Sequence, residues 1–163
     1  MKKVLVVMGS DSDLKVMEKC VDRLKSFGIP TEVRICSAHR TPAVAEQLAK
    51  NAAGEGFGVI IAAAGKAAHL GGVLAAYTTL PVIGVPMATS VMGGMDSLLS
   101  IVQMPKGIPV ATVAIDGADN AAILAAQMIA LSDDALAAKL AQFKADMAAE
   151  VTAKDEKVRA QFA

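Results

Sequence analysis

The sequence VLVVMGSDSDL, residues 4–14, is the most informative about the fold class, because in it a continuous apolar run ends abruptly in a short polar loop. An unbroken apolar run such as Val4–Met8 is typical of a parallel strand covered on both faces. After the loop, apolar residues recur at helical spacing as far as a stop at Gly28–Pro30: Leu14, Met17, Val21, Leu24 and Phe27. The stretch therefore predicts a strand, a loop and a helix, the first unit of an α/β domain.

The same unit recurs along the chain. Further strands are predicted at 33–36, 59–64, 82–85 and 110–115, and further helices at 42–53, 68–77, 95–104, 116–131 and 133–155. This alternation predicts parallel pairing with right-handed crossovers, so we expect a three-layer, doubly wound, flavodoxin-like α/β fold. We expect five parallel strands in the order 2-1-3-4-5, followed by a C-terminal helix whose charged end, from Thr152, frays.

Length and composition narrow the class of protein. The 163 residues fit a single domain spanning residues 1–163. Lys+Arg and Asp+Glu are 16 each, which argues against nucleic-acid or membrane binding driven by bulk charge. The charge-free run 67–95 is broken by glycines and prolines, so it offers no window of about 20 apolar residues for a spanning helix. The apolar run after Lys3 is too short for a signal peptide.

Cysteine and histidine usage argues against a metal centre. Two cysteines, Cys20 and Cys36, are too few for a disulfide framework, and their spacing fits no zinc-binding motif. The two histidines also lack the spacing of metal ligands. We therefore expect no metal, and reduced cysteines in a cytoplasmic protein. The surplus of small apolar residues predicts surface buried between subunits, with the C-terminal helix packing on the oligomer.

Three polar loops follow predicted strands. They are Gly9–Asp13, Ser37–Thr41 and Gly65–His69, and the rule for doubly wound sheets places all three at the edge where ligands bind. Both histidines of the chain, His39 and His69, fall on this rim. Chance is the competing explanation, since loops hold polar residues in any case, but the shared placement favours a site.

The first two loops suit an anion. The free N–H groups of a helix start favour phosphate in the Gly9–Asp13 loop, although Ser and Asp there could simply cap the helix. The loop has neither a nucleoside-triphosphate nor a dinucleotide motif. Arg40 in the neighbouring loop favours the phosphate interpretation, because a guanidinium binds phosphate through two hydrogen bonds.

The histidines are the candidates for proton transfer. Beside an anion-binding arginine, His39 becomes a general acid and base, whereas alone it would be an exposed turn residue. His69, among small apolar neighbours, is as compatible with a buried, hydrogen-bonded structural role as with a catalytic one. No Ser-His-Asp triad or reactive-cysteine motif is present.

Several motifs between residue 4 and about residue 131 form a specific combination: MGSDSD, SAHRTP, GKAAHL, LPVIGVP, DSLLSIVQMPKGIPVATVAI and NAAILAAQ. Together they resemble the PurE family of purine biosynthesis, and in particular its bacterial class I N5-carboxyaminoimidazole ribonucleotide mutases. The resemblance implies a cofactor-free transfer of a carboxylate from the exocyclic nitrogen to C4 of an imidazole, in a homo-octamer. The AAHL stretch with His69 favours the mutase over the animal-type carboxylases, which use free CO2.

The resemblance also assigns roles. It implies that His39 moves the proton, that Ser10, Asp13, Ser37 and Arg40 hold the ribose 5-phosphate, and that a loop encloses the carboxylate: Ala67, Ala68, His69 and Leu70. Gly9, Ser12, Gly65 and Lys66 complete the expected substrate-binding set. The family's usual loop, GAGGAAHLPG, has Gly, Gly and Pro where this chain has Ala63, Lys66 and Gly71, and Lys66 either assists carboxylate binding or points to solvent. The alternatives are a carboxylase using free CO2 and a non-catalytic phosphate- or nucleotide-binding module.

Overall fold

The computed structural model describes residues 1–163, and it confirms the predicted sheet. Five parallel strands pair in the order β2-β1-β3-β4-β5. Their bounds are Lys3–Met8 (β1), Thr31–Ile35 (β2), Phe57–Ala64 (β3), Val82–Pro86 (β4) and Ala111–Thr112 (β5). The helices are α1 (Leu14–Ser26), α2 (Pro42–Ala52), α3 (Leu70–Tyr77), α4 (Met95–Val102), α5 (Ala118–Ala130) and α6 (Asp134–Gln161), with single 3-10 turns η1 (Asp11–Asp13) and η2 (Met92–Gly94).

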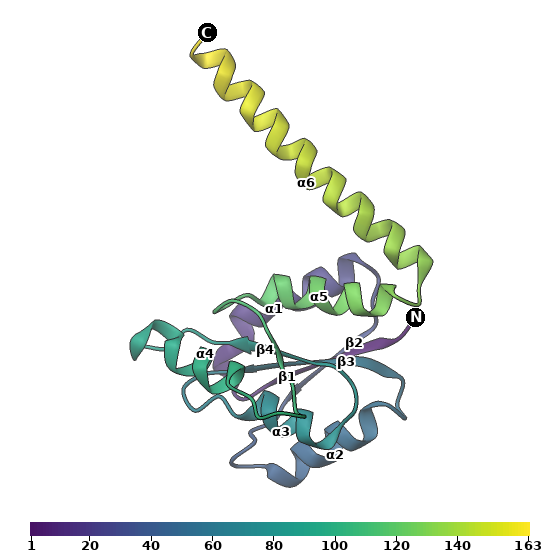
Figure 1. Cartoon of the computed structure of the whole chain (residues 1–163), viewed down its shortest axis with the longest axis vertical. Coiled ribbons are helices and arrows are strands. Elements are labelled where there is room, and N and C mark those ends of the chain that lie inside the picture. Colours follow the sequence, from purple (N-terminus) through teal and green to yellow (C-terminus); the bar gives the residue numbers. More distant parts are fainter.

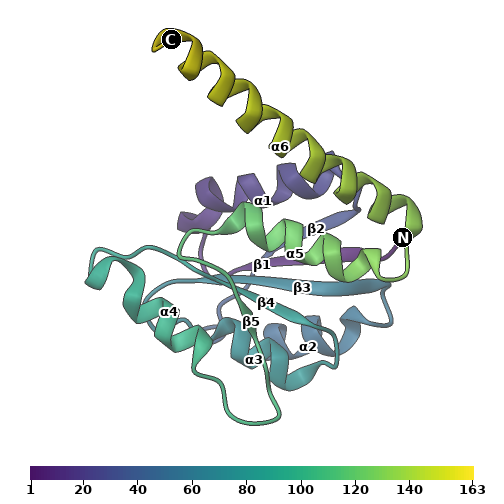
Figure 2. The same ribbon diagram turned by 45° about the horizontal axis from the view of Figure 1, so that its top comes forward.

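Helices cover both faces of the sheet, as Figures 1 and 2 show: α1 and α5 lie on one face, and α2, α3 and α4 on the other. The alternating side chains of β1 divide between these layers. Val4, Val6 and Met8 belong to the core under α1 and α5, whereas Leu5 and Val7 belong to the core under α2 and α3. This double coverage explains the unbroken apolar run. None of the helices combines the length and apolar character that crossing a membrane requires.

The fifth strand is shorter than predicted. Regular pairing with β4 covers only Ala111–Thr112, although 110–115 was expected. The chain still runs beside β4, since Val113 N–H donates to the carbonyl of Gly84 at 3.1 Å and Asp116 N–H to that of Pro86 at 2.8 Å. Contact with β4 therefore continues as isolated hydrogen bonds as far as Asp116, whose φ is 54°.

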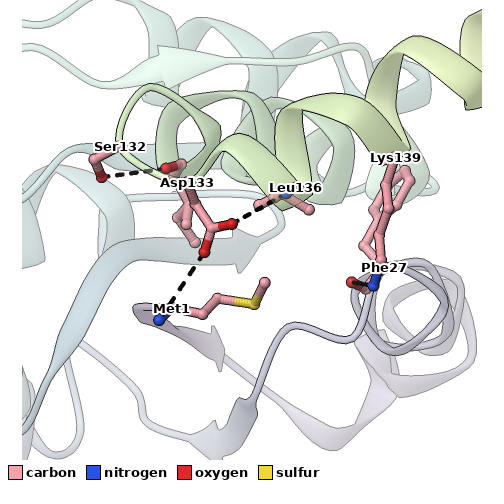
Figure 3. Close-up of polar contacts among 7 residues, drawn as sticks. Met1, Phe27, Ser132, Asp133, Leu136 and Lys139 are labelled. Atoms are coloured by element: carbon pink, nitrogen blue, oxygen red, sulfur yellow. Dashed lines mark hydrogen bonds and ion pairs between the residues drawn. The ribbon is translucent and has the colours of Figure 1, made fainter.

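The start of α6 is fastened to the body of the domain (Figure 3). Asp133 caps the helix by accepting from Leu136 N–H at 3.0 Å, and its carboxylate lies 4.0 Å from the N-terminal ammonium of Met1. One turn later, Lys139 Nζ donates to the carbonyl of Phe27 at 2.9 Å. Leu136 is fully buried, so the first turns of α6 are anchored by both packing and polar contacts.

Beyond these turns α6 projects away from the domain (Figure 1). The expected fraying from Thr152 is wrong, because the helix continues to Gln161. Side-chain pairs four residues apart support its outer turns, including Glu150 with Lys154. Apolar residues of this outer part are exposed: Val151 is 66% and Val158 52% accessible.

Candidate functional site

A cavity of about 600 Å³ opens at the carboxyl edge of the sheet, between the loops that follow β1, β2, β3 and β4. It brings together all but two of the residues predicted from the sequence: Gly9, Ser10, Ser12, Asp13, Ser37, His39, Arg40, Gly65, Lys66, Ala67 and Leu70. Of the other two, Ala68 is fully buried beneath the loop. His69 is exposed and contacts His39 instead. The predicted loops therefore share one pocket.

The loop after β1 combines a helix start with a cavity wall. Ser10 caps η1, because its hydroxyl accepts from Ser12 N–H at 3.3 Å. The helix-cap interpretation of this loop is thus correct for Ser10, yet the same residue lines the cavity. Asp13, the last residue of η1, is 9% accessible. Burial raises the pKa of the Asp13 carboxyl above its ordinary value of 3.8; the Ser12 hydroxyl opposes this, and the carboxylates of Asp116 and Asp11 add to it.

The loop after β2 is a tight turn built by two hydroxyl side chains. The Thr41 hydroxyl donates to the Ser37 carbonyl at 2.9 Å and accepts from Ser37 N–H at 3.1 Å. The Ser37 hydroxyl in turn accepts from Arg40 N–H at 3.1 Å and from Arg40 Nε at 3.4 Å. Pro42 then begins α2. Because the backbone and Nε of Arg40 are held in this way, the two terminal nitrogens of its guanidinium remain free for a ligand.

The two histidines meet at the rim of the cavity. Nε2 of His39 lies 2.8 Å from Nδ1 of His69, with the rings nearly perpendicular at 79°. Such a hydrogen bond needs one protonated and one unprotonated nitrogen, so each ring fixes the tautomer of the other. Both rings are exposed, so of the two alternatives left open for His69 the buried one does not hold. The pair offers a proton donor and acceptor beside an open cavity.

The loop after β3 turns sharply at Lys66. Its φ is 54°, and its carbonyl accepts from Ala68 N–H at 2.8 Å and from the Ser100 hydroxyl at 3.4 Å. The next residues place Ala68 in the core and His69 directly before α3. The turn therefore presents Lys66 at the cavity and His69 to His39.

One wall of the cavity was not predicted from the sequence. Met87–Ser90, after β4, lines the cavity, and the same rule for carboxyl ends of parallel strands could have identified it. Asp116 holds this wall, since its Oδ1 accepts from Ala88 N–H at 2.8 Å. Buried Ser97 adds a hydroxyl contact to the Met87 carbonyl at 2.7 Å. The chain has no group of three His, Cys, Asp or Glu side chains placed to hold a metal ion.

Comparison with known families agrees with this geometry. A family model described as AIR carboxylase matches residues 3–150. The chain belongs to the AIR carboxylase family. The family assignment made from the sequence motifs is thereby confirmed, and the match extends through the strands and loops that form the cavity.

The similarity of this AIR carboxylase family member to curated relatives extends over nearly its whole length. It is 52% identical over 159 residues to the N5-carboxyaminoimidazole ribonucleotide mutase of Methanocaldococcus jannaschii, covering 98% of this chain and 99% of the relative. It is 49% identical over 152 residues to the chloroplastic phosphoribosylaminoimidazole carboxylase of Vigna aconitifolia, covering 93% of this chain but 27% of that protein.

A solved structure extends the comparison to the fold. The crystal structure of Treponema denticola PurE superposes with a TM-score of 0.85 at 30% identity, covering 94% of this chain and 96% of that one. The predicted doubly wound fold is therefore confirmed.

Proposed function

We propose that this chain is an N5-carboxyaminoimidazole ribonucleotide mutase of purine biosynthesis, an isomerase that forms 4-carboxyaminoimidazole ribonucleotide. The contact between His39 and His69, 2.8 Å apart at the cavity rim, is the observation that carries the proposal. The similarity to the mutase of Methanocaldococcus jannaschii supports the same reaction. We further propose a small-molecule ribonucleotide as the only substrate, with no cofactor.

His39 serves first as an acid and then as a base in the proposed reaction. It protonates the carbamate nitrogen, the bond from this nitrogen to the carboxylate carbon breaks, and CO2 is released beside a free amine. C4 of the electron-rich ring attacks CO2 and forms a new carbon–carbon bond. The C4 proton then returns to His39, so the reaction neither consumes nor produces a proton. Contact with His69 fixes which nitrogen of His39 carries the proton between these steps.

The remaining loops hold the substrate in this proposal. Ser10, Asp13 and Ser37 contact the ribose 5-phosphate, and the free guanidinium nitrogens of Arg40 bind its phosphate. The Ala67–Leu70 segment encloses CO2 on the side of His69. A small apolar wall there keeps CO2 near C4 and excludes water, which shortens the time between release and recapture.

The competing reaction is direct carboxylation of aminoimidazole ribonucleotide by free CO2. The description of the matching family and the name of the Vigna aconitifolia relative favour this second candidate. Two assays separate the candidates: N5-carboxyaminoimidazole ribonucleotide at low bicarbonate, and aminoimidazole ribonucleotide with bicarbonate. We expect fast turnover only in the first assay. Turnover only in the second would establish the carboxylase, and turnover in neither would favour a non-catalytic ribonucleotide-binding module.

We also propose a homo-octamer in the cytoplasm. The exposed apolar residues of α6, including Val151 and Val158, support packing of this helix on a neighbouring subunit. The two free, buried cysteines support a reducing compartment. Mass measurement by light scattering tests the assembly: an octamer is expected, and a monomer at micromolar concentration would contradict it.

A further inference from the structure

Lys66 has a backbone conformation that long side chains rarely adopt. Its φ of 54° is in the left-handed region, and the turn is stabilised through its carbonyl by Ala68 and Ser100 rather than through its side chain. Glycine would adopt this turn without strain. A strained residue at the edge of a cavity points to a role for the side chain that the turn itself does not require.

The charges around the cavity make Lys66 unusual in a second way. Among the side chains that line the cavity, only Arg40 and Lys66 carry a full positive charge, and only Asp13 is acidic. Lys66 is exposed and takes part in none of the ion pairs of the chain. Because residues 67–95 contain no charged side chain, Lys66 is the only cation on the loops that follow β3 and β4.

The proposed substrate carries two separate anionic groups, a phosphate at one end and a carboxylate at the other. Arg40 is held by Ser37 on the loop after β2, the side assigned to the phosphate. Lys66 belongs to the same turn as His69, which contacts the proposed proton carrier His39. In the proposed reaction the carboxylate must lie near His39. Lys66 is therefore on the side of the cavity where the carboxylate binds.

We infer that Lys66 recognises the carboxylate of the ribonucleotide and makes the cavity prefer carboxylated over decarboxylated ligands. This specificity role rests on the proposed function. It assigns the two cations of the cavity to the two anions of one ligand, Arg40 to the phosphate and Lys66 to the carboxylate.

The test compares two ligands that differ by the carboxylate alone, 4-carboxyaminoimidazole ribonucleotide and aminoimidazole ribonucleotide. Calorimetry should show that Lys66→Gln weakens binding of the carboxylated ligand by about tenfold or more, the lower range for a hydrogen bond to a charged group. Binding of the decarboxylated ligand should stay within about twofold, because Arg40 and the other groups that hold this ligand are unchanged. Lys66→Arg should retain the preference. Lys106→Gln, at an exposed lysine outside the cavity, is the matched control and should change neither constant.

A second variant separates recognition from the strained turn. Lys66→Gly should lose the preference as Lys66→Gln does, while its thermal midpoint rises because the backbone strain is relieved. An equal change for both ligands in Lys66→Gln, or no change for either, overturns the inference. The mutase assay on the unaltered protein is independent of this comparison: binding of both ribonucleotides without turnover defeats the proposed reaction alone, and binding of neither defeats the inference as well.

Discussion

Replacement of Arg40 by alanine should weaken ribonucleotide binding by about a hundredfold. The backbone and Nε of Arg40 are held by the Ser37 hydroxyl, which leaves the two terminal nitrogens for the phosphate. Two charge-assisted hydrogen bonds at the lower value of about 1.5 kcal/mol each sum to about 3 kcal/mol, or about two powers of ten in Kd. Titration calorimetry with aminoimidazole ribonucleotide measures this loss without any contribution from catalysis.

Two variants control for charge and geometry. Arg40→Lys retains the positive charge but loses the planar pair of donors, so its Kd should lie between those of the native protein and Arg40→Ala. Arg34→Ala removes an exposed arginine of β2 that pairs with Glu32 outside the cavity, and it should leave Kd unchanged. An unchanged Kd in Arg40→Ala would refute the phosphate role and the division of labour between the loops.

Three further perturbations test the site. His39→Asn should lower kcat by about 10²- to 10⁴-fold with Kd unchanged, because it removes the proton carrier; weakened binding with intact kcat would make His39 an anchor instead. Asp116→Ala should raise KM more than Asp116→Asn, since only asparagine keeps an acceptor for Ala88 N–H; equal KM values would show that this contact does not position the wall. The raised pKa of Asp13 means that the folded state binds this proton more tightly than the unfolded state, so stability falls as pH rises through the interval above 3.8. In thermal melts Asp13→Asn should therefore be stabilising at pH 7 but not below pH 3.8, and a gain independent of pH would contradict this cause.

The sheet could be predicted because its signals are local. The apolar run of β1 and the polar loop after it specify a doubly covered strand and a helix start without reference to the rest of the chain. The extent of β5 could not be predicted, since the apolar run continues to Ile115 although the regular pairing with β4 covers only Ala111–Thr112. The outer turns of α6 were underestimated, although Glu150 and Lys154 have the spacing of a helix-supporting pair.

The site was predicted as a shared edge of the sheet but not as a set of contacts. The carboxyl ends of parallel strands meet at one edge, which placed His39 and His69 on the same rim. Their separation of 2.8 Å depends on how the loops pack, which no spacing in the sequence records. The contact from Asp116 to Ala88 joins residues 28 apart in the chain, and nothing in either segment indicates it.

Retention of the carboxylate carbon is the most direct test of the proposed reaction. N5-carboxyaminoimidazole ribonucleotide, isotopically labelled at its carboxylate carbon, is converted in a buffer that contains unlabelled bicarbonate, and the product is analysed by mass spectrometry. If CO2 is enclosed between the histidine pair and the Ala67–Leu70 segment, the 4-carboxyaminoimidazole ribonucleotide retains the label at every bicarbonate concentration. Dilution of the label to the level of the dissolved bicarbonate would contradict enclosed transfer.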